Sequence, residues 1–333
     1  MTMLSLVAPC YNEQDNVRPF AESVRRELAP LAGWLDYEII FINDGSRDKT
    51  LPALQELVAK GADNITVLDF SRNFGKEAAI YAGLRTAAGD YIAFVDADLQ
   101  QPIAVVREML EFLEQNPEYD AACAYQETRL EGAGMSFLKR SFYRVINALC
   151  EVPLHTDASD FRVIRRPVAE AILAMPEYHR FSKGIFSWIG FNTYYRPYQA
   201  QARRAGETSW STRQLFRYAL DGIISFSTKP LRLATGLGGL LSAASLVYMV
   251  AVIVQKLLWG NDVPGYPTLV VLILLMGGIQ LIVLGILGEY LARVHIETKH
   301  RPIYLQKGRY HCRRGQTPPA DAETDEQNMA VTR

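Results

Sequence analysis

The sequence contains little cysteine and no recognisable cysteine pairing. Its 333 residues include four cysteines, and these are scattered as Cys10, Cys123, Cys150 and Cys312, with no Cys-x-x-Cys pair and no nearby histidine ligands. The pattern indicates neither a disulfide framework nor a zinc site. The formal net charge is −1, which gives no global attraction to nucleic acid, so we expect no nucleic-acid partner. The sequence also lacks Gly-x-Gly-x-x-Gly and Gly-x-x-x-x-Gly-Lys-Ser/Thr, the motifs of dinucleotide sites and P-loops.

Charge is nearly missing from two long apolar runs, Leu237–Leu258 and Thr268–Leu291. Each run has about 22 residues, and a helix of that length spans about 33 Å, enough to cross a bilayer. We therefore predict two transmembrane helices behind a soluble domain. The alternative is a buried helical hairpin in the core of a large soluble protein.

The charged residues around these runs predict an orientation in the membrane. The connecting loop, Gly260–Pro267, has no Lys or Arg, whereas basic residues lie on both outer flanks: Lys229, Arg232, Arg293, Lys299, Arg301, Lys307 and Arg309. Because positive charge stays on the cytoplasmic side, we expect the catalytic domain and both termini in the cytoplasm.

The first half of the chain alternates short apolar runs with amphipathic stretches. We predict strands at Leu4–Ala8, Tyr37–Ile42, Ile65–Phe70 and Tyr91–Val95, and helices at Val17–Leu28, Leu51–Lys60 and Lys76–Ala88. This rhythm is typical of an α/β fold with a mostly parallel, doubly wound (Rossmann-like) sheet. Such sheets bind ligands beyond the carboxyl ends of their strands.

The remaining segments suggest a division into four parts. We expect a helix at Val105–Gln115 and strands at Ala121–Gln126, Phe161–Ile164 and Thr193–Gln201, which complete a catalytic domain over residues 1–210. Ser211–Ser227 has helical apolar spacing and is either an interfacial helix on the membrane or a helix packed on the domain. The predicted parts are then residues 1–210, an interfacial helix over 211–230, a transmembrane hairpin over 231–295, and a basic segment with a disordered tail over 296–333, the disorder beginning after Tyr310.

Four polar clusters follow the predicted strands and should meet in one crevice: Pro9–Glu13, Asn43–Ser46, Arg72–Lys76 and Asp96–Gln100. The central one is Asp96-Ala97-Asp98, because alternate carboxylates leaving a strand can point to one site. Such a pair suits a hard divalent cation that also binds phosphate oxygens. By itself an Asp-x-Asp pair is more often a pair of solvated turn acids.

The other clusters each have a plainer interpretation. Asp44 could accept hydrogen bonds from a base or ribose, or simply belong to an Asp-Gly turn. Tyr11 and Glu13 could cap a nucleotide, or form a loop that enters a helix. The segment ending in Lys76 could place cations beside phosphates, or be a solvated basic turn.

Taken together and in this order, the motifs resemble those of the inverting glycosyltransferase family 2, which has the GT-A fold. The motifs are Pro-x-Tyr-Asn-Glu, Asn-Asp-Gly-Ser, Arg-Asn-Phe-Gly-Lys and Asp-Ala-Asp-Leu-Gln. More narrowly, the chain is similar to polyprenyl-phosphate glycosyltransferases, the dolichol-phosphate-mannose synthase relatives and the bacterial bactoprenol glucosyltransferases with two C-terminal spans. The similarity covers roughly Met3 to Tyr310, and Leu287-Gly288-Glu289-Tyr290 also resembles that subgroup.

The resemblance implies roles for particular residues. Asp160, in Ser-Asp-Phe-Arg, would face the acceptor as the catalytic residue; its alternative is a strand cap or an ion pair with Arg162. Asp96 and Asp98 would hold Mg²⁺ or Mn²⁺ and the diphosphate. The nucleotide-sugar would be bound by Pro9, Tyr11, Glu13, Asp44, Lys76, Asp96 and Gln100. The acceptor phosphate would be bound by Arg129, Arg140 and Ser141. A lysine that relatives often have in the next loop is missing from Gly206–Trp210, and Arg203 or Arg204 would take its place.

The implied reaction is metal-dependent transfer of a hexose, glucose first and N-acetylglucosamine second, from a UDP-sugar to undecaprenyl (polyprenyl) phosphate. It would occur with inversion at the bacterial inner membrane, and relatives form homo-oligomers. Two rivals stay open. Gln214-Leu-Phe-Arg217-Tyr218 faintly resembles a motif of processive polysaccharide synthases, and a non-catalytic membrane scaffold could keep the fold.

Overall fold

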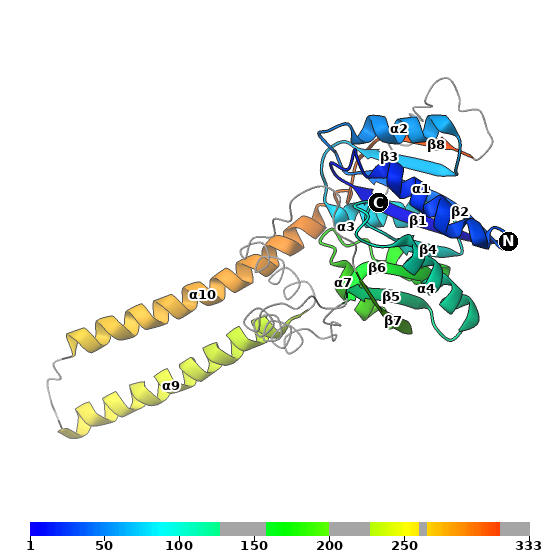
Figure 1. The fold of residues 1–333 in the computed structure, drawn as a ribbon. Helices are drawn as coiled ribbons and strands as arrows, with labels where there is room; N and C mark the ends of the chain where they lie inside the picture. The colour runs from blue at the N-terminus through cyan, green and yellow to red at the C-terminus, as the bar shows by residue number, and fades with distance from the viewer. Residues whose placement is uncertain (127–157, 200–226, 260–264, 314–333) are drawn as a thin grey trace.

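The computed structural model describes residues 1–126, 158–199, 227–259 and 265–313. Within them, an α/β domain carries a long helical hairpin that projects away from it (Figure 1). The predicted acceptor residues Arg129, Arg140, Ser141 and Arg203 lie outside the described residues, as do residues 211–226 of the predicted interfacial helix and the last twenty residues of the tail.

The domain is built on one sheet of eight strands among the described residues, in the order β7-β5-β6-β4-β1-β2-β3-β8. Its centre is parallel: β1 pairs with β2 and β4, and β2 pairs with β3. On one side β6 runs antiparallel to both β4 and β5, while β7 is parallel to β5. The strands are β1 (Thr2–Cys10), β2 (Leu35–Asn43), β3 (Ile65–Phe70), β4 (Tyr91–Phe94), β5 (Ala121–Gln126), β6 (Ala158–Arg165), β7 (Thr193–Tyr198) and β8 (Gln306–Cys312).

Helices cover both faces of the sheet, which explains why the central strands bury apolar side chains on both faces. In β1, Leu4 and Leu6 pack on one face and Val7 on the other, and all three are buried. The first face is covered by α1 (Val17–Leu28), α2 (Thr50–Lys60) and α4 (Ile103–Gln115). The second face is covered by α3 (Lys76–Thr86), α6 (Arg166–Leu173) and α7 (Ser182–Trp188). A short 3-10 turn, η1 (Ala29–Leu31), follows α1.

The predicted α/β rhythm is confirmed, with bounds that match or differ by at most three residues. The main difference lies at the C-terminus, where disorder was predicted after Tyr310. Instead β8 extends to Cys312 and pairs antiparallel with β3, placing Tyr310 opposite Val67 and His311 opposite Thr66. The segment was missed because alternate residues of β8 are exposed and polar, so it carries no apolar run, and backbone pairing at the sheet edge places it.

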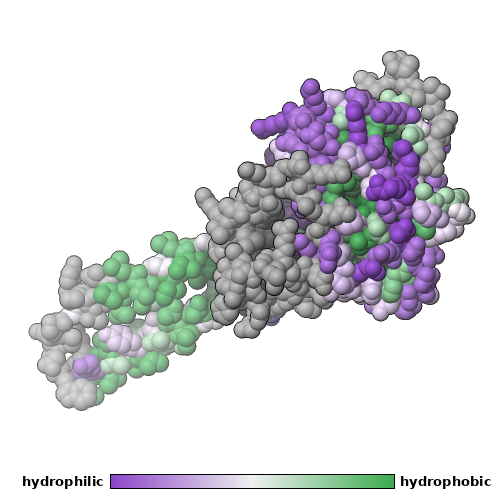
Figure 2. All heavy atoms as spheres, viewed as in Figure 1, coloured by the Kyte–Doolittle hydropathy of each residue, from purple (hydrophilic) through white to green (hydrophobic). Residues whose placement is uncertain are grey.

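The hairpin consists of α9 (Lys229–Trp259) and α10 (Tyr266–Thr298). Both helices contain stretches long and apolar enough to cross a membrane, Lys229–Gln255 and Val271–Thr298. Their large side chains face outward, as Leu240 at 68% and Leu274 at 69% exposure show, and Figure 2 shows this apolar surface along the hairpin. A helical hairpin buried in a soluble core is therefore not what the chain forms. Near the domain, the Tyr290 hydroxyl donates to the Ser227 carbonyl oxygen at 2.6 Å.

Candidate active site

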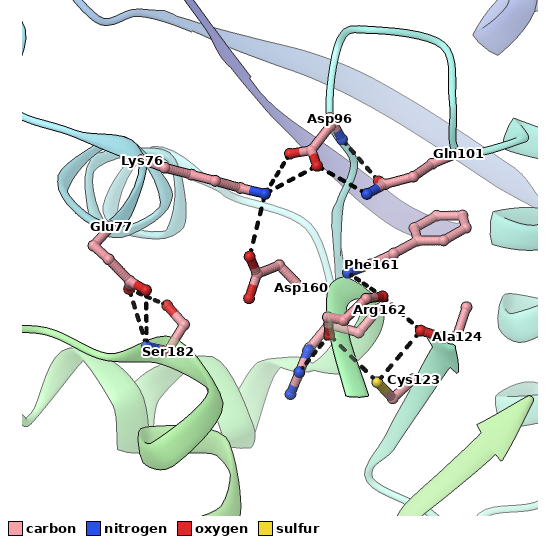
Figure 3. A network of polar contacts seen from close by, with 11 residues as sticks. Lys76, Glu77, Asp96, Gln101, Cys123, Ala124, Asp160, Phe161, Arg162 and Ser182 are labelled. Atoms are coloured by element: carbon pink, nitrogen blue, oxygen red, sulfur yellow. Dashed lines mark hydrogen bonds and ion pairs between the residues drawn. The ribbon is translucent and has the colours of Figure 1, made fainter. Parts of the chain in front are cut away.

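Lys76 lies between two carboxylates that are far apart in the sequence (Figure 3). Its Nζ is 2.7 Å and 2.9 Å from the two carboxylate oxygens of Asp96, and 3.2 Å from Oδ2 of Asp160. Burial would lower the pKa of Lys76, but the charges of Asp96 and Asp160 outweigh it and raise that pKa above its usual value. Lys76 therefore stays a cation that joins the two acids.

The sheet explains how Asp160 reaches this place. Asp96 follows β4, and β6 runs antiparallel beside β4 with Arg162 opposite Phe94, so the start of β6 meets the end of β4. Burial would raise the pKa of Asp160, but Lys76, Arg162 and Lys183 hold it below its usual value. Asp160 is thus an ionised carboxylate at neutral pH, and its ion pair is with Lys76, although the sequence suggested Arg162 as the alternative partner.

Asp96 is also held by a residue that the sequence did not point to. The Asp96 N–H donates to Oε1 of Gln101 at 2.9 Å, and Gln101 Nε2 donates to Oδ2 of Asp96 at 2.9 Å. The predicted Gln100 instead donates its backbone N–H to Oδ1 of Asp98 at 3.0 Å. Two adjacent glutamines follow the acid pair, and only the backbone turn decides which one faces Asp96.

Both acids of the Asp-x-Asp motif lie near Tyr198 on β7. Burial first, and then the charges of Asp96 and Asp98, raise the pKa of Tyr198 to about 12. Tyr198 is a further site residue that sequence reasoning missed, because no local motif marks it. Its phenol remains protonated at neutral pH and can donate a hydrogen bond.

The predicted nucleoside residues gather around the ends of β1 and β2. The Asp44 N–H donates to the Cys10 carbonyl oxygen at 2.9 Å, and the Asn12 N–H donates to Ser46 Oγ at 3.0 Å, so the first two clusters touch. Tyr11 is 43% exposed and available to a ligand. The Glu13 carboxylate accepts a hydrogen bond from Asn16 Nδ2 at 2.6 Å. Pro9 is half-buried beside them.

Asp44 has a clear structural task. Its two carboxylate oxygens accept the backbone N–H groups of Phe74 at 2.6 Å and Gly75 at 2.9 Å. Burial raises the pKa of Asp44, and these hydrogen bonds and Arg72 oppose that rise. Asp44 thereby fixes the loop that leads into Lys76, whereas its contact with a nucleoside stays a prediction.

The acid pair fits a hard divalent cation only in part. Carboxylate oxygens are the ligands that Mg²⁺ and Mn²⁺ favour, but among the described residues no three Asp, Glu, His or Cys side chains gather in a group able to hold an ion. The cation would thus need further oxygens from a phosphorylated ligand, as Mg²⁺ sites commonly do. Asp96, which also pairs with Lys76, and Asp98 are the acids that would hold it.

A mostly parallel sheet covered on both faces, with an Asp-x-Asp pair after β4, defines a GT-A glycosyltransferase. The chain belongs to glycosyl transferase family 2, whose model matches residues 5–173. Residues 229–294 match the GtrB C-terminal hairpin, which agrees with α9 and α10.

Similar proteins span nearly the whole chain. The bactoprenol glucosyl transferase of Shigella phage SfV is 40% identical over 91% of this chain and 98% of its own length. A prophage bactoprenol glucosyl transferase homolog of Escherichia coli K12 is also 40% identical, over 91% and 98%. A solved glucosyl-3-phosphoglycerate synthase from Mycobacterium tuberculosis, in complex with Mn²⁺ and UDP-glucose, has a TM-score of 0.45 and 20% identity, covering 67% of this chain and 77% of that one. A likeness that distant carries no conclusion about donor or metal.

Proposed function

We propose that the protein transfers a hexose from a UDP-sugar to undecaprenyl (polyprenyl) phosphate at the cytoplasmic face of the membrane, with inversion and with Mg²⁺ or Mn²⁺. Glucose is the first choice of sugar and N-acetylglucosamine the second. One observation carries the proposal: a single chain joins the Lys76-centred acid cluster to a hairpin whose apolar side chains face outward. A water-soluble acceptor would not require that hairpin.

The reaction is a single displacement. An oxygen of the acceptor phosphate forms a bond to the anomeric carbon, the bond from that carbon to the β-phosphate oxygen breaks, and its electron pair leaves with UDP. The acceptor needs little activation, since a phosphate monoester with a second pKa near 6 is largely ionised at pH 7. A bound divalent cation would stabilise the charge of the departing diphosphate.

The chain's own residues would supply position and charge. Asp160, ionised and fixed by Lys76, would orient the acceptor and stabilise positive charge on the sugar in an oxocarbenium-like transition state. Lys76 would approach the diphosphate oxygens, and Asp98, with Asp96, would hold the cation. Pro9, Tyr11, Glu13 and Asp44 would surround the nucleoside. Holding the reactants in line removes orientational freedom before the chemical step.

We place the domain and both termini in the cytoplasm, because the basic residues lie at and beyond the ends of α9 and α10 that are nearest the domain. The division into a catalytic domain, an interfacial helix, a hairpin and a C-terminal segment belongs to this proposal, with β8 added to the catalytic sheet. A homo-oligomer stays a prediction of the family resemblance.

The test offers the purified protein a panel of UDP- and GDP-sugars with undecaprenyl phosphate and Mg²⁺ or Mn²⁺. We expect label from a UDP-hexose to enter the organic phase as one sugar per lipid; a polymer would support the processive synthase instead.

Asp98→Ala should abolish transfer. Asp36→Ala, at the opposite end of the strands in β2, should leave it unchanged. Full rates in EDTA would overturn the metal role, and label that never enters lipid would overturn the acceptor.

A further inference from the structure

The end of the membrane hairpin contacts the domain at a short segment, residues 178–182, which lies just before and at the start of α7. Glu297, in the last turn of α10, accepts the backbone N–H groups of Tyr178 at 2.9 Å and His179 at 3.5 Å. A carboxylate at the C-terminal end of a helix is disfavoured by the helix dipole. The two N–H donors offset this unfavourable interaction with the dipole. We therefore take the contact of Glu297 with residues 178 and 179 as a structural role of this carboxylate.

Residues 180 and 182 of the same segment also contact α3. The backbone N–H of Ser182 donates to both carboxylate oxygens of Glu77, at 3.1 Å and 3.0 Å, and the Ser182 hydroxyl donates to Glu77 as well. Two residues earlier, the Arg180 guanidinium lies 4.5 Å from the ring centre of Tyr81. Glu77 and Tyr81 are four residues apart and therefore share one face of α3.

Glu77 is the residue after Lys76, in the first turn of α3 (Figure 3). Fixing Glu77 therefore fixes the turn that places Lys76 between Asp96 and Asp160. Ser182 is only 4% exposed and Glu77 is half-buried, so their contact lies partly out of water, where a hydrogen bond is electrostatically stronger than at the surface.

We propose that Glu297 and Glu77 are positioning residues, and that through residues 178–182 they couple the end of the membrane hairpin to Lys76. Neither carboxylate touches the reacting groups. Their effect is that α10 and the first turn of α3 share one rigid support. Only the kinetic test of this coupling rests on the proposed function. The coupling itself is a property of the fold and can be measured without activity.

Hydrogen exchange measured by mass spectrometry tests the coupling without any activity. In full-length protein, Glu297→Ala should speed exchange in peptides covering residues 178–182 and also in those covering the first two turns of α3. Thr298→Ala is the matched control, since the Thr298 hydroxyl bonds only within its own helix, to the His295 carbonyl oxygen. Glu297→Gln keeps the accepting Oε1 and should restore protection in both regions.

Three results would overturn the coupling: faster exchange confined to residues 178–182, no change in either region, or an equal effect of Thr298→Ala. If Glu297→Ala also speeds exchange in the central strands β1 and β2, the whole domain is destabilised, and the milder variant Ser182→Ala is used to test the coupling instead. That variant removes the hydroxyl bond to Glu77, and it should speed exchange in α3 while β1 and β2 stay protected; unchanged exchange in α3 would refute the link.

The kinetic test uses the same variants in the lipid-transfer assay. Glu297→Ala should lower kcat while KM for the donor stays within about twofold, because geometry rather than binding is lost. Glu297→Gln should recover most of kcat. Equal kcat in Glu297→Ala and the wild type would contradict the positioning role. A wild type that transfers no sugar would instead refute the proposed function, and the exchange result would still decide the coupling.

Discussion

At the residue scale, Asp160 gives the most direct test of the site. Asp160→Asn keeps the shape of the side chain but removes the charge that faces Lys76, which would still pair with Asp96. We expect kcat to fall about a hundredfold, as loss of a positioned group can cause, while UDP binding measured by calorimetry is retained. Asp120→Asn is the control. The Asp120 carboxylate accepts the backbone N–H of Asn192, and it is not one of the acids that pair with Lys76. Unchanged turnover in Asp160→Asn would remove that residue from the site.

Glu77 predicts a pH dependence of stability. Burial, then the charge of Asp160, raises the pKa of Glu77 above its usual 4.5, although Ser182 and Arg180 oppose the rise. A carboxyl whose pKa is raised on folding disfavours the folded state once it ionises, so the cost appears as pH rises above 4.5. The thermal midpoint of Glu77→Gln should therefore improve relative to wild type between about pH 4 and pH 8. A difference that is constant across this range would contradict the raised pKa.

Residues of the site were predictable where a motif and a strand end coincide. Lys76, Asp96 and Asp160 were all named from the sequence, and the structure brings them together. Gln101, Glu77 and Tyr198 were not, because their places depend on a backbone turn, a contact with α7 and the register of β7. The roles of Arg129, Arg140, Ser141 and Arg203 stay predictions.

At the element scale, Gly45 lies in the loop between β2 and α2 and packs against the loop before α3. Its φ is +64°, and a Cβ there would overlap the backbone of Arg72 and Asn73. Gly45→Ala should therefore cost roughly 2 kcal/mol or more of stability, from the left-handed backbone and the displaced loop, and should weaken donor binding. Gly33→Ala is the control, since a Cβ at Gly33 meets nothing within 4 Å. Equal thermal midpoints for both variants would contradict the close approach.

Elements were predictable in proportion to their apolar patterning. Ile65–Phe70 and Val17–Leu28 match their predicted bounds because continuous or helically spaced apolar residues mark them. Helices α6 and α7 were not predicted, since each has at most eight residues and little periodicity can show in that length. Strand β8 was not predicted because its alternate residues are polar and exposed, so that it contains no apolar run.

At the scale of the whole molecule, β8 changes how the hairpin can be removed. Cutting the chain after Ser227 would delete the hairpin and also strip β8 from the edge of β3. Such a truncated protein should lose stability, so that its activity would say little about anchoring. The Tyr290–Ser227 hydrogen bond shows that the two helices lie close together near the domain, and a short Gly/Ser linker replacing residues 231–289 should therefore keep Tyr290, Glu297 and β8.

This excised protein should bind the UDP-sugar with the affinity of the full chain, because the site lies in the α/β domain. It should also glycosylate a short-chain, water-soluble polyprenyl phosphate. Transfer to undecaprenyl phosphate in vesicles should fall about a hundredfold or more, since a tethered enzyme meets its acceptor at a much higher effective concentration than a free one. Undiminished transfer in vesicles would mean that the hairpin does more for location in the cell than for catalysis. Loss on both acceptors, with donor binding intact, would mean that the hairpin shapes the acceptor site itself.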